Sequence, residues 1–293
     1  MCIRDSINKA KKTKFGIEHQ FHKINSIEEY TDKVPIRDYE EIKKYIEEIK
    51  KGSKDVLWPG KPKYLAKTSG TTSGVKHIPI TSESMPNHIL SSRNALLFYI
   101  YETGDTSFLN GKTIFLQGSP VLDEINGILS GRLSGIVAHH IPSYLRKNNL
   151  PSIKTNSIED WEEKVNEICK ETINENMTII GGIPSWVQMY FETLLKKSNK
   201  KNIGQVFKNL KLYIYGGVNF SPYEKIFNKL LGKKINTIEY YPASEGFFAY
   251  QNSQKDKSLL LQYNSGIFYE LSLIHISEPT RRTPISYAVF SMK

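Results

Sequence analysis

Apolar strand-like runs alternate with helical segments over residues 112–240, and this alternation is the feature that most constrains the fold. Two of the runs end in paired glycines, and the stretches between the runs carry apolar residues at helical spacing. This pattern predicts an α/β layer with a mostly parallel sheet flanked by helices, followed by a β-rich extension. The predicted strands are 112–117, 177–180, 212–215 and 235–240, with 247–251, 259–263 and 267–269 in the extension.

Capping patterns indicate where the helices begin and end. Ser157 with Asp160, and Ser221 with Glu224, are typical of capping boxes at helix starts. Pro184 suits the first turn of a further helix, and Gly52 is expected to end an earlier one. The predicted helices are 39–51, 82–101, 157–174, 184–195 and 221–231.

The composition limits the class of protein. The chain has 293 residues, 39% of them hydrophobic, which is globular and leaves room for one large domain or two modest ones. No apolar run approaches the roughly 20 residues of a membrane-spanning helix. Cys2 and Cys169 are too far apart in sequence to indicate a disulfide framework, which fits a reducing cytoplasm. We predict a cytoplasmic monomer without a membrane partner.

The net charge of +10 raises the question of a nucleic-acid partner. The lysines are spread along the chain, and neither an RNA-binding signature nor a Cys/His finger accompanies them. A solvated lysine-rich surface is the favoured interpretation, and no nucleic acid is predicted as a partner. The same charge favours polyanionic small molecules such as nucleotides.

Both ends of the chain differ from the rest. Residues 1–6 and 271–293 resemble translated sequencing-adapter sequence. We therefore expect them to be foreign and exclude them from the fold. The expected natural domain covers 7–270, with a carboxyl-terminal domain missing.

The segment 67–76 has the richest chemistry in the chain. It contains five hydroxyl side chains and two glycines between Lys67 and Lys76. Glycines let backbone N–H groups converge on an anion, while hydroxyls and lysines add hydrogen bonds and charge. Only three residues separate Gly70 from Gly74, so the segment does not fit the Walker A spacing. A polyphosphate cradle and a Ser/Thr-rich surface turn both remain open on these grounds.

Two further segments follow predicted strands. Glu245 stands beside Ser244 after the strand 235–240, where carboxylates and hydroxyls bind ligands in α/β proteins. An oxygen ligand of this kind suits Mg²⁺. The strand 212–215 ends in Gly216 and Gly217, where a flat ligand can approach the backbone closely.

Together these segments resemble the adenylate-forming enzymes and, within them, the auxin-responsive Gretchen Hagen 3 family of acyl acid amido synthetases. The resemblance covers nearly all of 7–270, in family order and at family-like spacing. It implies the large N-terminal domain of a firefly-luciferase-like enzyme. The segments that carry it are 28–35, 56–60, 182–186, 215–223, 241–246 and 268–270.

The resemblance implies a reaction in two steps. ATP adenylates a carboxylic acid and releases pyrophosphate, and the amine of an amino acid then attacks the acyl carbon and expels AMP. ATP and Mg²⁺ are the implied cofactors, and a small carboxylic acid and an amino acid are the implied partners. A thioester-forming ligase such as an acyl-CoA ligase, or a non-catalytic nucleotide- or acid-binding module, remains the alternative.

Site residues follow from the resemblance by position. Glu245 would bind Mg²⁺, Ser244 would touch the α-phosphate, and both share the catalytic role with Thr71. The implied phosphate cradle is Ser69, Gly70, Thr71, Thr72 and Ser73, with Lys76 assisting. Gly216, Gly217, Val218, Tyr241 and Ala243 are implied to line the nucleotide, with Tyr241 flanking the base.

Other conspicuous residues are given structural interpretations. Asp105, in Tyr101–Asp105, lies in a stretch similar to the family's ribose-binding motif. The stretch stands between the segment 67–76 and the other motifs rather than after 241–246, and it is interpreted as a turn. The ribose-binding aspartate is expected beyond residue 270, so the chain as given is expected to be inactive. His139 and His140 are interpreted as a packed or surface pair, and Cys169 as a buried core residue.

Overall fold

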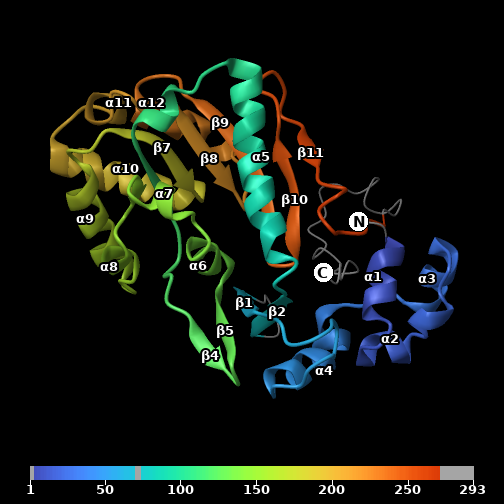
Figure 1. The fold of residues 1–293 in the computed structure, drawn as a ribbon. Helices are drawn as coiled ribbons and strands as arrows, with labels where there is room; N and C mark the ends of the chain where they lie inside the picture. Colours follow the sequence, from blue (N-terminus) through green and yellow to red (C-terminus); the bar gives the residue numbers. More distant parts are fainter. Residues whose placement is uncertain (1–2, 70–73, 271–293) are drawn as a thin grey trace.

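The computed structural model describes residues 3–69 and 74–270 (Figure 1). Four residues of the implied phosphate cradle, Gly70, Thr71, Thr72 and Ser73, lie outside the described residues. The same holds for residues 1–2 and for the whole of the adapter-like segment 271–293. Within the described part, every helix is too short or too polar to cross a lipid bilayer.

A large sheet forms the centre of the molecule, and seven of its strands lie in the described residues, in the order β11-β10-β9-β8-β7-β3-β6. Neighbours from β6 to β9 are parallel, whereas β9, β10 and β11 are antiparallel. The prediction of a mostly parallel sheet with a β-rich extension is confirmed. The strands are β3 (Lys112–Leu116), β6 (Asn149–Leu150), β7 (Met177–Gly182), β8 (Leu212–Gly216), β9 (Asn236–Ala243), β10 (Gly246–Gln251) and β11 (Leu259–Leu261).

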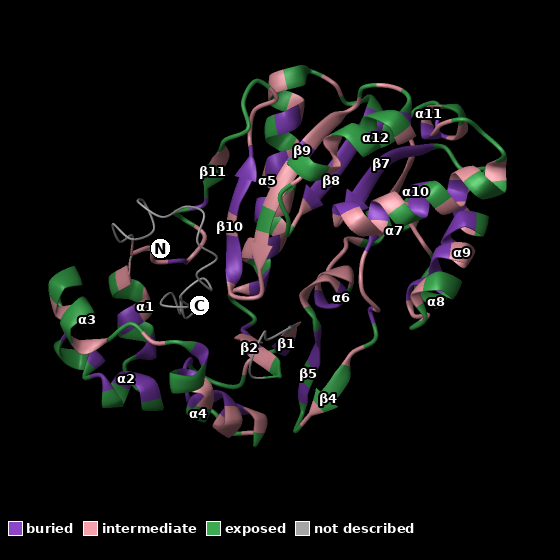
Figure 2. Cartoon of the chain, turned by 180° about the vertical axis from the view of Figure 1, so that it is seen from behind, coloured by how far each residue is buried: buried purple, intermediate pink, exposed green. Residues whose placement is uncertain are grey.

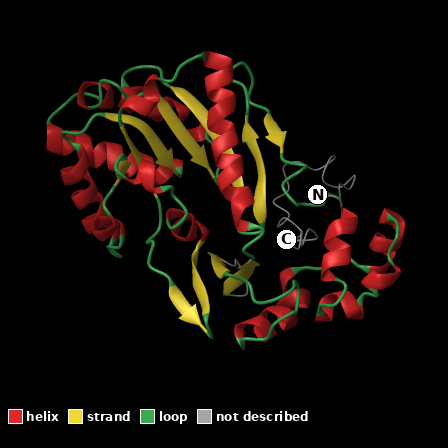
Figure 3. Ribbon diagram, in the orientation of Figure 1, coloured by secondary structure: helices red, strands yellow, loops and turns green. Residues whose placement is uncertain are grey.

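Helices cover both faces of this sheet (Figure 3). Side chains of β8 alternate between the two faces. Leu212 and Ile214 join a core with α5 (Met85–Thr103), and Tyr213 and Tyr215 join the core on the opposite face. Figure 2 shows β7 and β8 as mainly buried strands, as expected of a sheet covered on both sides. The helices of the opposite face are α9 (Trp161–Thr172), α10 (Pro184–Ser198) and α12 (Glu224–Leu231), with α11 (Ile203–Val206) beside them.

A smaller sheet lies beside the large one, with strand order β2-β1-β5-β4. β1 (Tyr64–Ser69) and β2 (Val75–Ile80) form an antiparallel hairpin, and β1 pairs in parallel with β5 (Ile128–Arg132). β4 (Asp123–Ile125) is joined to β5 through Asn126 and Gly127, whose φ angles of 47° and 80° are both positive. Two left-handed residues match a type I′ hairpin turn. β4 and β5 were not predicted, although the Asn-Gly pair signals them.

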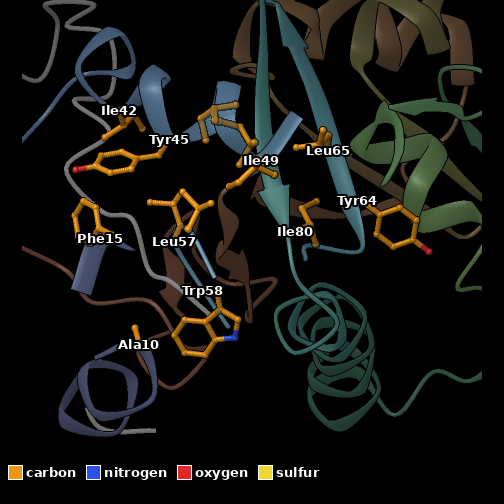
Figure 4. Close-up of a cluster of buried hydrophobic side chains, with 14 of the residues drawn as sticks. Ala10, Phe15, Ile42, Tyr45, Ile49, Leu57, Trp58, Tyr64, Leu65 and Ile80 are labelled. Atoms are coloured by element: carbon orange, nitrogen blue, oxygen red, sulfur yellow. The ribbon is translucent and has the colours of Figure 1, made fainter. Parts of the chain in front are cut away.

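The amino-terminal helices pack on the smaller sheet. Asp38 and Glu41 form a capping box at the start of α4 (Tyr39–Lys50), and Gly52 follows its end with φ of 93°. Figure 4 shows Tyr45 and Ile49 of this helix in one core with Leu65 and Ile80 of the sheet. The other amino-terminal helices are α1 (Ile3–Ala10), α2 (Lys14–Glu18) and α3 (Ile27–Lys33), and the remaining short helices are α6 (Leu133–Ala138), α7 (Ser143–Arg146) and α8 (Ile153–Asn156).

Both predicted capping boxes are wrong in position. α9 begins at Trp161, because the Asp160 carboxylate itself accepts from the Glu163 N–H at 2.7 Å, and Ser157 instead ends α8. Ser221 begins a 3₁₀ turn, where its N–H donates to Asn219 Oδ1 at 2.9 Å.

The last predicted strand is also wrong. Residues 267–269 run outside the sheet, and Ile267 packs against Gly246 while the rings of Phe268 and Tyr30 lie 5.6 Å apart. This segment therefore packs between α3 and the first residue of β10.

His88 of α5 is expected to make the stability of the fold sensitive to acid. It is 4% exposed, its Nδ1 has no hydrogen-bond partner among the described residues, and burial lowers its pKa to about 4. The unfolded chain takes up a proton near pH 6.5 and the folded chain does not. The free energy of unfolding should therefore fall by up to about 3 kcal/mol as the pH drops from 6.5 to 4.

Thermal unfolding across this pH range tests the prediction on His88. His88→Leu should flatten the pH dependence between pH 6.5 and 4, whereas His22→Gln, at an exposed histidine, should leave it unchanged. Parallel pH profiles for wild type and His88→Leu would contradict the prediction.

Candidate functional site

The hairpin of β1 and β2 presents the hydroxyl- and glycine-rich segment. Ser69 is the last residue of β1 and pairs with Val75, while Thr68 pairs with Lys76. Gly74, which precedes β2, has φ of 77° and open space where a Cβ would lie. The hairpin thus holds Ser69 and Lys76 at the two ends of the loop.

The carboxyl ends of β8 and β9 form the second part of the site. Gly216 pairs with Tyr240, and a Cβ on Gly216 would lie 2.4 Å from the Tyr240 carbonyl oxygen. Gly217 follows with φ of 81° and open space around it. Gly216 is therefore required for the close approach of the two strands, and Gly217 for the turn that leaves the sheet. In open α/β sheets, ligands bind beyond the carboxyl ends of the strands.

The turn between β9 and β10 contributes Ser244 and Glu245. Ala243 pairs with Gly246, so Ser244 and Glu245 form the tip of a tight hairpin. Glu245 is partly buried, and this burial raises the pKa of its carboxyl group, while the positive charge of Lys76 acts in the opposite direction. The hairpin of β1 and β2 and the turn after β9 therefore lie within electrostatic reach of each other.

Apolar groups are exposed at the same edge. Val218 and Tyr241 are each 41% exposed, and the Tyr241 ring lies 5.5 Å from that of Phe248. Tyr215, by contrast, stacks on Phe220 at 4.6 Å inside the core. Val218 and Tyr241 are thus open to a flat ligand such as a nucleotide base, whereas Tyr215 is part of the core.

Glu245 is the carboxylate that fits a metal ion here. Among the described residues, no group of three or more His, Cys, Asp or Glu side chains is arranged to hold a metal. Mg²⁺ does not need such a cage, because it commonly binds through one or two carboxylates together with substrate phosphates. Glu245, a partly buried carboxylate within electrostatic reach of Lys76, would supply one such ligand.

Asp105 lies at the opposite edge of the sheet. It follows Gly104, which ends α5 in a left-handed conformation, and it precedes the amino end of β3. Its carboxylate accepts from the N–H and Oγ of Ser107 at 2.8 and 2.6 Å. The interpretation of this stretch as a turn is confirmed.

The histidine pair and the cysteine also have structural roles. His139 Nε2 lies 2.7 Å from the Pro120 carbonyl oxygen, and His140 Nε2 lies 2.9 Å from Tyr64 Oη. Each histidine thus has its own partner. Burial raises the pKa of the Cys169 thiol to about 11, which disfavours the nucleophilic thiolate. These interpretations are also confirmed.

A row of basic residues across β2, β1 and β5, made of His77, Lys67 and Arg132, was not predicted from the sequence. Lys67 pairs across the small sheet with His77 on one side and Arg132 on the other, and its ammonium group forms an ion pair with Asp123. The signal was the Asn126-Gly127 hairpin, which would have indicated the strand that carries Arg132.

Comparison with protein families gives a match over most of the chain. Residues 2–235 match the model described as the GH3 family N-terminal domain. A comparison with curated proteins gave no match.

Solved structures show the same fold. A structure of GH3.15 acyl acid amido synthetase matches with a TM-score of 0.66 and 14% identity, covering 88% of this chain and 55% of that one. A structure of AtGH3.15 acyl acid amido synthetase in complex with 2,4-DB matches with a TM-score of 0.65 and 14% identity, covering 88% of this chain and 56% of that one. This chain spans about half the length of these two structures. More distantly, the O-succinylbenzoate coenzyme A synthetase MenE from Bacillus subtilis, in complex with AMP, has a TM-score of 0.37 at 16% identity, covering 79% and 40%.

Proposed function

The chain belongs to the GH3 family, and on that basis we propose that its site serves the ATP-dependent joining of a carboxylic acid to an amino acid. The fold is that of the N-terminal domain of this family, as predicted. The observation that carries the proposal is the position of Glu245, partly buried in the turn at the carboxyl edge of the large sheet and within electrostatic reach of Lys76, whose ammonium group lies over the Tyr39 ring. Cationic, carboxylate and exposed apolar groups then meet at one edge, as binding of a magnesium nucleotide requires.

Different residues of the site are proposed to bind different parts of the nucleotide. Ser69 and Lys76 would hold the phosphates together with Gly70, Thr71, Thr72 and Ser73. Ser244 would donate to the α-phosphate, and Glu245 would hold Mg²⁺, which, when bound, offsets phosphate charge. Gly216, Gly217, Val218, Tyr241 and Ala243 would lie along the nucleoside.

Adenylation requires the acid to be held in line with the leaving pyrophosphate. A carboxylate oxygen of the acid attacks the α-phosphorus, and the bond to the bridging oxygen breaks with release of pyrophosphate. Hydrogen-bond donors and cations at the loop and at Ser244 stabilise the charge that develops on the phosphate oxygens. The amine of an amino acid then attacks the acyl carbon and expels AMP to form the amide.

Acid-dependent exchange between ATP and pyrophosphate tests the proposal. The assay uses an extended protein, in which this chain continues beyond Glu270 with the remaining part of a GH3 protein. We expect exchange only with a carboxylic acid present, and an amide product when an amino acid is added. The 293-residue chain, assayed in parallel, is expected to yield no amide, because it spans only about half of the matched structures.

The same assay separates the alternatives. A thioester product with coenzyme A, and no amide with any amino acid, would favour a thioester-forming ligase. ATP binding without acid-dependent exchange would favour a non-catalytic nucleotide-binding module. Either result would overturn the proposed amide synthesis.

A further inference from the structure

Arg132 lies at the same edge of the small sheet as the loop after Ser69. β1 and β5 are parallel, and Lys67 pairs with Arg132 at the end of β5. Ser69 stands two residues beyond Lys67 on the neighbouring strand. Because parallel strands end at the same side, Arg132 is brought beside the entrance to the hydroxyl- and glycine-rich loop.

The side chain of Arg132 packs on the segment that follows β3 of the large sheet. A Cβ on Gly118 would lie 3.0 Å from Arg132 Cδ, so the aliphatic stem of the arginine passes over this glycine. Gly118 follows β3, at the carboxyl edge of the large sheet. Figure 1 shows β5 leading into α6 below this edge. Arg132 therefore connects the end of β5 with the segment that follows β3, at the carboxyl edge where the proposed nucleotide site lies.

The segment beneath Arg132 is held from both sides. Lys164 is 3% exposed, and its Nζ donates to the carbonyl oxygens of Gln117 at 3.2 Å and Asn156 at 2.5 Å. A Cβ on Gly135 of α6 would lie 2.5 Å from the Ser119 carbonyl oxygen. These contacts fix residues 117–119, so the arginine stem packs on a well-defined surface.

The guanidinium group of Arg132 is free to take an anion. Arg132 is exposed, and within residues 3–69 and 74–270 no carboxylate forms an ion pair with it. Asp123, the nearby acidic residue, is bound to Lys67 instead. A planar guanidinium binds phosphate oxygens through two parallel hydrogen bonds, which a lysine cannot reproduce.

We propose that Arg132 binds the β- and γ-phosphates of the nucleotide, and the pyrophosphate formed from them. This inference rests on the proposed function. Ser244 and Glu245 are assigned to the α-phosphate and metal, whereas Arg132 ends β5, the strand that pairs with β1 near its last residue, Ser69. Its position thus assigns it to the leaving group rather than to the carboxylic acid.

Exchange kinetics in the extended protein test this assignment. Arg132→Gln should raise the KM for pyrophosphate by about tenfold or more, as expected from loss of charged hydrogen bonds. The KM for the carboxylic acid should change less than about twofold. Arg132→Lys should have a KM for pyrophosphate between those of the wild type and Arg132→Gln. Arg146→Gln, at an exposed arginine on α7 that donates to the Ile141 carbonyl, is the matched control and should leave both values unchanged.

Two results would overturn the assignment: an unchanged KM for pyrophosphate, or a rise confined to the KM for the acid. Failure of the proposed function is distinguishable, because the unsubstituted extended protein would then show no exchange. In that case ³¹P NMR line broadening of inorganic pyrophosphate by the 293-residue chain tests whether Arg132 binds pyrophosphate. Arg132→Gln should abolish the broadening, and its persistence, or its absence with the unsubstituted chain, would contradict the inference.

Discussion

Glu245→Gln is expected to abolish acid-dependent exchange of pyrophosphate into ATP by the extended protein. Glutamine keeps the shape of the side chain at the turn between β9 and β10 but removes its charge, and with it the proposed Mg²⁺ ligand. Loss of an ionised ligand should cost several kcal/mol of transition-state stabilisation, or a rate reduction of about 100-fold or more. The measurement is exchange at saturating ATP, with thermal unfolding to show that the variant is folded.

The pH dependence of exchange gives an independent check on Glu245. Burial raises the pKa of this carboxyl group. The carboxylate is needed in its ionised form, so exchange should fall as the pH is lowered through the raised pKa. Glu245→Asp, which retains the charge on a shorter side chain, should keep an acid-sensitive activity where Glu245→Gln has none.

Asp105→Asn is the matched control for Glu245→Gln. Asp105 is also a carboxylate, in a stretch similar to a family motif that is interpreted as a turn, but it lies at the opposite edge of the sheet, bonded to Ser107. Its replacement should leave exchange within about threefold of wild type, since surface changes away from the site alter stability only slightly. Near-normal exchange by Glu245→Gln, or collapse in a folded Asp105→Asn protein, would reverse the two assignments.

Most of the large sheet could be predicted because its longer strands carry their own local signals, whereas the two-residue β6 was not predicted. β7 and β8 are short apolar runs, and each ends in glycine where the chain turns out of the sheet. The errors in the predicted helix starts fall where several side chains can cap a helix. Asp160 caps α9 by itself, so Ser157, three residues earlier, was free to end α8.

The pairing of β1 with β5 at the centre of the small sheet was not predicted because it joins segments that lie far apart in the sequence. Tyr64 pairs with Leu129, far along the chain, and no periodicity within either strand indicates this partner. The Asn126-Gly127 turn was a local signal for β4 and β5, but it does not say which strand β5 joins. The environment of Arg132 therefore required the structure.

The candidate site was predicted in pieces. The Ser244-Glu245 turn and the glycines after β8 follow from strand ends, and parallel strands must bring these together. The electrostatic influence of Lys76 on Glu245 depends instead on how the small sheet packs beside the large one. Because Gly70, Thr71, Thr72 and Ser73 lie outside the described residues, their proposed contacts with phosphate remain predictions.

Gly216→Ala is expected to separate β8 from β9 and so to damage both stability and nucleotide binding. The added Cβ would lie 2.4 Å from the carbonyl oxygen of Tyr240 and 3.2 Å from its carbonyl carbon. These are backbone atoms of a paired strand, which cannot move aside as the end of a flexible side chain can. Overpacking of this kind typically costs about 1–3 kcal/mol of the free energy of unfolding.

The neighbouring glycine provides the control for Gly216→Ala. Gly217 has φ of 81° and nothing within 4 Å of the place where a Cβ would lie, so Gly217→Ala meets only the strain of a left-handed backbone, about 1 kcal/mol. Urea unfolding should therefore rank Gly216→Ala as the less stable variant. In the extended protein, the KM for ATP should rise more for Gly216→Ala, because the exposed Val218 and Tyr241 lie at the ends of the two strands that this methyl group forces apart. Equal stability and equal KM in both variants would show that the site does not depend on the close approach of β8 and β9.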